Sequence, residues 1–143
     1  LNYAIDLRYG VLIDIGLAVF EERPVDLRMG AVNVIWQGDA NSICLRSLAH
    51  CESPPAILNV TGPETASVRY LAREFGSRFG KEPIFSNEES PNALLNNSAK
   101  AHRLFGYPRV TLPEMIEATA DWIQNGGALL AKPTHFAVRD GKF

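Results

Sequence analysis

The chain has 143 residues, 46% of them apolar, which suits one globular domain with a sizeable core. Sixteen acidic against fourteen basic side chains give a net charge of −2 with no run of like charges, so a nucleic-acid partner is not expected. The apolar runs are too short to cross a bilayer and no secretory leader opens the sequence, which predicts a cytoplasmic protein without a membrane partner.

The chain begins inside a predicted strand, residues 1–5, with no methionine, as a fragment of a longer protein would. A polar bend follows. The next segment carries an apolar stripe at helical spacing that includes Leu12, Ile15 and Val19, and it ends before Pro24. Strand 1–5 and this helix form the first strand–helix unit.

Two further strands are predicted at 25–28, where apolar and polar residues alternate, and at 32–36. Asp39 is then placed to cap a helix. The residues expected on the inner face of this helix are Ala40, Ile43, Cys44 and Leu48. Cys44 and Cys51 would lie about two helical turns apart, roughly 10 Å and too far for a disulfide, so both are expected to be buried thiols.

After a surface linker at 52–55, residues 57–60 form an apolar run that predicts a buried strand, ended by Gly62 and Pro63. A helix over 68–79 follows, with Ser67 as its cap and Gly80 as its stop. Residues 83–86 predict a short strand. This alternation indicates an α/β fold in which short parallel strands alternate with helices.

The last part of the chain is expected to hold a loop at 87–97, a short helix at 98–105 and a final amphipathic helix that starts at a capping box of Thr111 and Glu114. The tail from 128 to 143 has no periodicity. It is expected to lie extended against another surface or to be loose.

The sequence contains no glycine-rich dinucleotide loop, Walker loop or nucleophile elbow, and its histidines show no metal-ligand spacing with the cysteines, so no metal site is predicted. The polar or aromatic residues near strand ends, where open α/β sheets bind ligands, are Asn2, Tyr3, Tyr9 and Asn33. A turn or capping role is equally open for each of them. Trp36 fits either a pocket wall or the core.

The order of the segments resembles the C-terminal, substrate-binding portion of the NAD-dependent epimerase/dehydratase family, the extended short-chain dehydrogenases. Residues 33–40, Asn-Val-Ile-Trp-Gln-Gly-Asp-Ala, are similar to the family's strand-to-helix junction His-Val-x-Asp-x-Ala. Residues 58–62 with Ser67-Val68 resemble its Tyr-Asn-Val-Gly … Ser-Val stretch, and 98–107 resemble its Ser-Lys-Ala … Leu-Gly-Trp signature. The resemblance implies a portion at 1–127 that includes edge strands of a parent Rossmann sheet, followed by the tail at 128–143.

What the resemblance implies is a fragment of an enzyme that uses NAD or NADP on a small molecule such as a sugar or a nucleotide-sugar. Neither the cofactor loop nor the family's Tyr-x-x-x-Lys pair is found here, so the chain alone is expected to hold no cofactor, to have no catalytic residue and to be inactive. By position, Asn2 or Tyr3 would lie beside the nicotinamide, and Asn2, Tyr9, Asn33 and Trp36 would face the substrate. Val32 stands where nucleotide-sugar enzymes of the family carry an arginine, so a phosphate clamp would be missing there.

Detached from their neighbours, the strands at 1–5 and 57–60 would expose backbone and apolar side chains, which predicts self-association into a homo-oligomer. The alternative is a non-catalytic interaction or small-molecule-binding module that has kept the fold.

Overall fold

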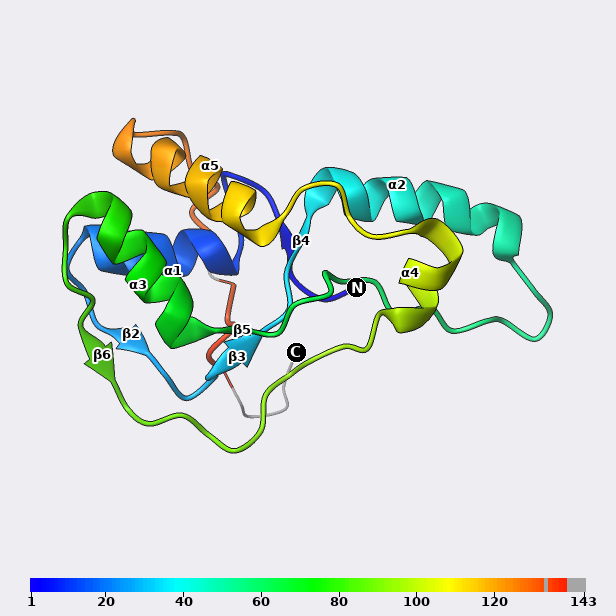
Figure 1. Ribbon diagram of the computed structural model, residues 1–143, viewed down its shortest axis with the longest axis horizontal. Helices are drawn as coiled ribbons and strands as arrows, with labels where there is room; N and C mark the ends of the chain where they lie inside the picture. The colour runs from blue at the N-terminus through cyan, green and yellow to red at the C-terminus, as the bar shows by residue number, and fades with distance from the viewer. Residues whose placement is uncertain (133, 139–143) are drawn as a thin grey trace.

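A computed structural model of the chain describes residues 1–132 and 134–138. Helices α1 (Val11–Phe20), α3 (Val68–Phe79) and α5 (Leu112–Gln124) contact one another at one end, and α2 (Gln37–Ser47) and α4 (Ala99–Phe105) contact each other at the other end (Figure 1). A single 3-10 turn, η1 (Leu48–His50), continues α2. The strands lie between these two helical groups or beside the first one.

Each described strand has two residues, and the strands form three separate pairs. β1 (Ala4–Ile5) pairs in parallel with β4 (Ile35–Trp36), and β2 (Val25–Asp26) pairs in parallel with β6 (Phe85–Ser86). β3 (Ala31–Val32) and β5 (Ala66–Ser67) are antiparallel. The predicted α/β class with short parallel strands and helices is therefore confirmed, and one antiparallel pair is added to it.

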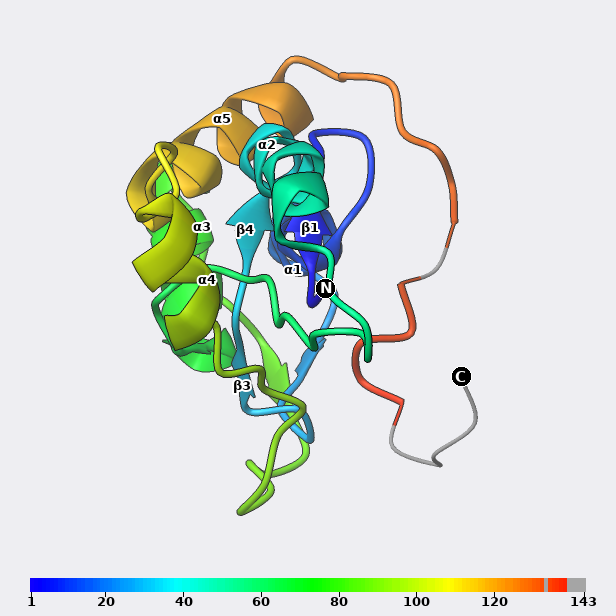
Figure 2. The ribbon, with the colours of Figure 1, turned by 90° about the vertical axis from the view of Figure 1, so that its right-hand side faces the viewer.

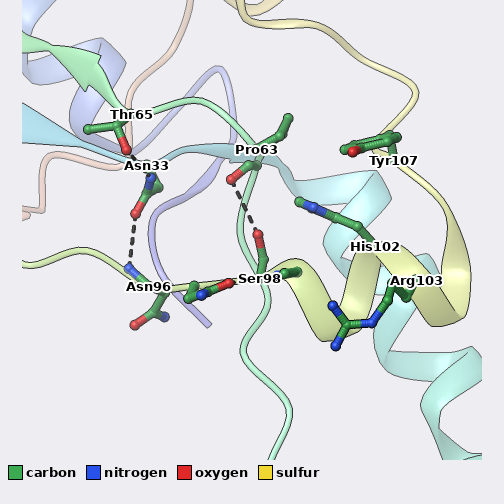
Figure 3. A pocket seen from close by; sticks show the side chains of 11 residues that line it. Asn33, Pro63, Thr65, Asn96, Ser98, His102, Arg103 and Tyr107 are labelled. Carbon is green, nitrogen blue, oxygen red and sulfur yellow. Dashed lines mark hydrogen bonds between the residues drawn. The ribbon is translucent and has the colours of Figure 1, made fainter.

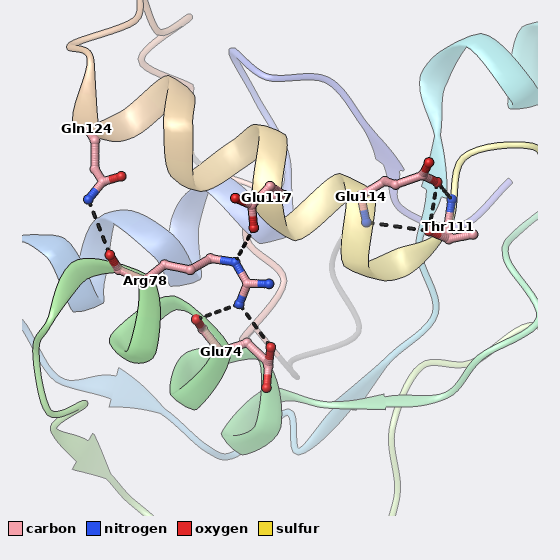
Figure 4. Close-up of polar contacts among 6 residues, drawn as sticks. All are labelled: Glu74, Arg78, Thr111, Glu114, Glu117 and Gln124. Atoms are coloured by element: carbon pink, nitrogen blue, oxygen red, sulfur yellow. Dashed lines mark hydrogen bonds and ion pairs between the residues drawn. The ribbon is translucent and has the colours of Figure 1, made fainter.

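The larger of two apolar clusters is built from the faces that helical spacing predicts for α1, α3 and α5. Phe75 of α3 is fully buried at its centre. At the surface, Arg78 of α3 reaches α5, where its Nε lies 2.8 Å from Glu117, while its Nη1 lies 2.9 Å from Glu74 on its own helix (Figure 4). Apolar contacts thus hold the three helices together, and the guanidinium of Arg78 adds a link between α3 and α5.

The predicted strand at 57–60 is wrong, because this segment has no strand structure in the described chain. Ile57 is 84% exposed, and the backbone contact of this segment with the first strand is a single hydrogen bond from the Asn2 amide to the Val60 carbonyl. A short apolar run becomes a strand only when another backbone pairs with it along its length, and here the Ile57 carbonyl accepts instead from the Lys100 side chain of α4 at 3.4 Å.

The predicted strands at 1–5 and 32–36 are shorter than expected for local reasons. Tyr3 adopts a left-handed backbone with φ of 45°, so the first strand starts at Ala4. Asn33 and Val34 separate β3 from β4, so one predicted strand becomes two that pair with different partners.

The prediction for α2 is partly wrong. Trp36, not Asp39, occupies the N-cap, and Asp39 instead accepts hydrogen bonds from the amides of Arg109 and Val110 at 3.1 and 3.0 Å. Ala40 and Ile43 are buried as predicted, but Leu48 and both cysteines are exposed. The inner face of α2 packs on a small second cluster that includes Ala40 and Ile43. Cys44 and Leu48, which were predicted to share that face, are not part of this cluster.

The predicted ends of α3 and α5 are confirmed. Ser67 accepts from the Tyr70 amide at 3.3 Å, Gly80 adopts the left-handed conformation, and Thr111 and Glu114 form the reciprocal capping box (Figure 4). These hydrogen bonds from Thr111 lower the pKa of Glu114.

The described part of the tail crosses back over the molecule, as Figure 2 shows. The Leu130 amide donates to the Arg8 carbonyl at 3.0 Å, the Thr134 hydroxyl donates to Asp14 of α1, and Phe136 packs against the larger cluster. The described part of the tail thus contacts the rest of the chain. Residues 133 and 139–143 of the predicted tail lie outside the described residues, so the expectation for the tail as a whole stays a prediction. None of the described helices is long and apolar enough to span a membrane.

Candidate functional site

A cavity of about 630 Å³ opens where the chain after β3, the turn at 62–65 and the start of α4 come together (Figure 3). This volume lies in the range of small-molecule sites. The residues that line it are Asn33, Gly62, Pro63, Thr65, Asn96, Asn97, Ser98, Ala99, His102, Arg103 and Tyr107. Asn33 is the one predicted site residue among them.

Asn33 ties together three segments around this cavity. Its Nδ2 donates to the Glu64 carbonyl at 3.0 Å and to the Thr65 hydroxyl at 3.2 Å, and its Oδ1 accepts from the Asn96 amide at 2.9 Å (Figure 3). Its side chain is almost fully buried, so these bonds replace water for both ends of the amide. Asn33 therefore positions the wall of the cavity.

The turn beside Asn33 depends on Gly62. A Cβ built there would lie 2.1 Å from the Val34 carbonyl oxygen, so the backbone approaches more closely than any side chain allows. The Ser98 hydroxyl, 5% exposed at the residue level, reaches the Gly62 carbonyl at 3.5 Å. The glycine that the sequence marks as a strand stop thus brings the turn against β4 and α4.

The opposite wall carries the cationic and aromatic side chains of α4 and the residues after it. His102 Nε2 lies 3.2 Å from the Thr61 carbonyl, which can only accept, so this nitrogen donates and carries the proton. The Tyr107 ring lies 4.9 Å from the His102 ring, centroid to centroid, and Arg103 lies on the other side of His102 (Figure 3). This wall can bind negative charge and a flat group.

Asn2 and Tyr3 lie outside the residues that line this cavity. The Asn2 Nδ2 donates to the Leu94 carbonyl at 3.1 Å, and its own carbonyl accepts from the Thr61 hydroxyl at 3.0 Å. Tyr3 is partly buried, and this burial raises the pKa of its phenol. Asn2 thus contacts the two segments that border the cavity, and its role beside a nicotinamide stays a prediction.

Tyr9 and Trp36 are not brought to the cavity either. Tyr9 closes the bend after β1 through paired backbone hydrogen bonds of 3.2 Å with Asp6. Trp36 is half-buried and packs against the larger core cluster. Both have structural roles in this chain, and their contact with a substrate remains a prediction.

The residues that sequence reasoning missed are the ones on α4. His102 follows Ser98 by one helical turn, so the two share a face, and this spacing was the available signal. Within residues 1–132 and 134–138, no group of three or more histidine, cysteine, aspartate or glutamate side chains is placed to hold a metal ion.

The fold is that of a C-terminal portion of Rossmann-type extended short-chain dehydrogenases, as comparison with solved structures shows. The chain aligns with UDP-glucose 4-epimerase from Thermus thermophilus in complex with NAD, with a TM-score of 0.62 and 19% identity over 87% of this chain and 43% of that one. UDP-glucose 4-epimerase from Thermotoga maritima with UDP-glucose gives 0.62 and 15% identity over 88% and 43%. UDP-glucuronic acid 4-epimerase from Bacillus cereus with NAD gives 0.62 and 19% over 80% and 39%.

The chain thus spans about two fifths of the length of these enzymes. The resemblance read from the sequence is confirmed at the level of the fold. No protein-family model and no curated protein matches the sequence.

Proposed function

We propose that this chain is the substrate-binding portion of an NAD(P)-dependent epimerase, dehydratase or reductase that acts on a sugar nucleotide. The observation that carries the proposal is the cavity around Asn33, a ligand-sized space in a fold shared with sugar-nucleotide epimerases. A cavity lined by amides, hydroxyls and one arginine suits a hydroxyl-rich, charged ligand better than an apolar one.

In this proposal the chain supplies cleft walls and the nucleotide-binding half of the fold supplies NAD or NADP. Asn33 and its partners hold the turn at 62–65 and the segment at 96–98 in fixed positions around the ligand. Asn2, which precedes β1, contacts Thr61 and Leu94 next to the same region, and this contact supports its proposed place, with Tyr3, near the cofactor. Hydride and proton transfer are assigned to residues outside this chain.

Titration calorimetry on the 143-residue chain tests whether it binds the substrate and leaves the cofactor to the other half of the fold. UDP-glucose is expected to bind measurably, because its site lies in this portion, whereas NAD⁺ is expected to give only heats of dilution. Tight NAD⁺ binding without UDP-glucose binding would contradict the proposal. The Thermus thermophilus epimerase serves as the positive control for both titrations.

We also propose that the isolated chain self-associates through the segment at 55–58. Ile57, Leu48 and Leu45 are each more than two-thirds exposed and offer apolar surface to a second copy of the chain. Sedimentation should show a dimer or larger species that Ile57→Lys dissociates. A monodisperse monomer of the unmodified chain would refute this part.

A further inference from the structure

The lining of the cavity around Asn33 carries an excess of positive charge, which the proposed function does not by itself explain. Its lining contains the guanidinium of Arg103 but no aspartate or glutamate. Two other cavities of the described chain that contain an arginine, one beside α1 and one beside α2, also contain an aspartate. An arginine in a polar cavity without a carboxylate is available to a negatively charged ligand.

Arg103 also differs from half of the ten arginines of the chain in its contacts. Five arginines form ion pairs with nearby carboxylates, namely Arg8, Arg23, Arg28, Arg69 and Arg78. Within the described part of the chain, Arg103 has neither an ion pair nor a hydrogen bond through its guanidinium. Its planar fork of donors therefore remains free to bind an oxyanion with two hydrogen bonds.

The neighbours of Arg103 add the other elements of a phosphate-ester site. The rings of His102 and Tyr107 lie close together, 4.9 Å between centroids and tilted by 37°, and Tyr107 is 73% exposed, so its ring face is open to a flat group. Asn97 accepts from the Ala99 amide through its Oδ1 at 3.0 Å, which leaves the NH₂ of the same side chain as a donor. A phosphate with a ring attached meets a cation, amide donors and a stacking surface within one cavity.

No arginine occupies the position where the resemblance implies one that binds phosphate. Val32 stands there, and it is fully buried in β3. A cation that binds phosphate in this cavity must come from another element, and Arg103 is the arginine that lines it.

We propose that Arg103, with His102 and Tyr107 beside it, forms an anion-binding subsite of the Asn33 cavity that takes the phosphate of a nucleotide. The identity of the ligand as a nucleotide rests on the proposed function. The preference for an anion rests on Arg103 and its surroundings alone. Glu64 stands in sequence between the lining residues Pro63 and Thr65, and its Oε2 lies 3.7 Å from the point that a Cβ on the lining residue Gly62 would occupy, so its negative charge opposes binding.

Calorimetric titration of UMP and of uridine tests the subsite, because the two share a ring and only UMP carries phosphate. Wild-type chain is expected to bind UMP at least tenfold more tightly than uridine. Arg103→Gln should weaken UMP at least tenfold and leave uridine unchanged, and Glu64→Gln should tighten UMP several-fold. Arg73→Gln, which removes an exposed arginine of α3 far along the sequence from the cavity, is the matched control and should change neither ligand.

The subsite is overturned if Arg103→Gln and Arg73→Gln weaken UMP equally, because the effect would then be one of net charge. It is also overturned if UMP and uridine bind the wild type equally, a result that leaves the proposed function standing. If neither ligand binds, the subsite and the proposed function fall together. Arg103 and Arg73 are both exposed, so the melting temperatures of Arg103→Gln and Arg73→Gln should match that of the wild type. This measurement separates an effect on binding from an effect on folding.

Discussion

Replacing Asn33 with alanine tests whether this side chain organises the cavity. The substitution removes three hydrogen bonds, to the Glu64 carbonyl, the Thr65 hydroxyl and the Asn96 amide, at 3.0, 3.2 and 2.9 Å. With about 1 kcal/mol net for each bond, and more where a partner stays buried without one, the expected loss in free energy of unfolding is about 3 kcal/mol.

Urea denaturation followed by tryptophan fluorescence measures this loss. Asn41→Ala is the matched control, since Asn41 is exposed on α2 and accepts one hydrogen bond from Gln37, so its loss should stay within about 0.5 kcal/mol. If Asn33→Ala and Asn41→Ala unfold at the same urea concentration, Asn33 does not hold the cavity wall and the reasoning is refuted.

Three more substitutions probe the fold and its charges. Gly62→Ala places a methyl group 2.1 Å from the Val34 carbonyl and should cost about 3 kcal/mol or more in chemical denaturation; a loss below about 1 would show that the turn can move. Phe75→Ala empties the centre of the core and should cost about 3–5 kcal/mol by the same measurement, whereas a small loss would mean that α1, α3 and α5 collapse around the space. Hydrogen bonds from Arg28 lower the pKa of Asp26 to about 2, so the stability that this carboxylate contributes is present above about pH 4 and is lost as the pH falls towards 2. Arg28→Gln should raise this pKa towards its ordinary value in a carboxyl NMR titration, and an unchanged midpoint would contradict the assigned cause.

Sequence patterns predicted the helices of this fold well because their signals are local. The apolar stripe of α3 with Ser67 and Gly80 at its ends, and the Thr111–Glu114 capping box of α5, depend on residues within one or two turns. The same reasoning placed Asp39 wrongly, because the groups that it binds, the amides of Arg109 and Val110, lie far away in the chain.

Strands were predicted less well because a strand depends on a partner that a local pattern does not show. Residues 57–60 have the composition of a buried strand yet form no strand pairing with the described chain, and residues 32–36 divide at Asn33 because the two halves pair with different segments. Side chains on two-residue strands also follow no alternation long enough to be read.

The candidate site was predicted in part for a related reason. Asn33 was found because it precedes a predicted strand-to-helix junction, and the structure makes it the centre of the cavity wall. His102 and Arg103 on α4, and Tyr107 just after it, reach the same cavity from about 70 residues later in the chain, and nothing in their spacing shows which segment α4 packs against. Tyr9 and Trp36 share the sequence neighbourhood of strand ends but lie away from the cavity lining.

The measurement that tests the account most directly is a residue-resolved amide NMR titration of the chain with UDP-glucose and, separately, with NAD⁺. The account predicts saturable shifts from UDP-glucose at Asn33, Asn96 and His102, with no comparable saturable shifts from NAD⁺. Shifts from NAD⁺ around a site of its own, or UDP-glucose shifts confined to residues away from the cavity, would contradict the claim that this chain supplies substrate-binding walls and leaves the cofactor to another part of the fold.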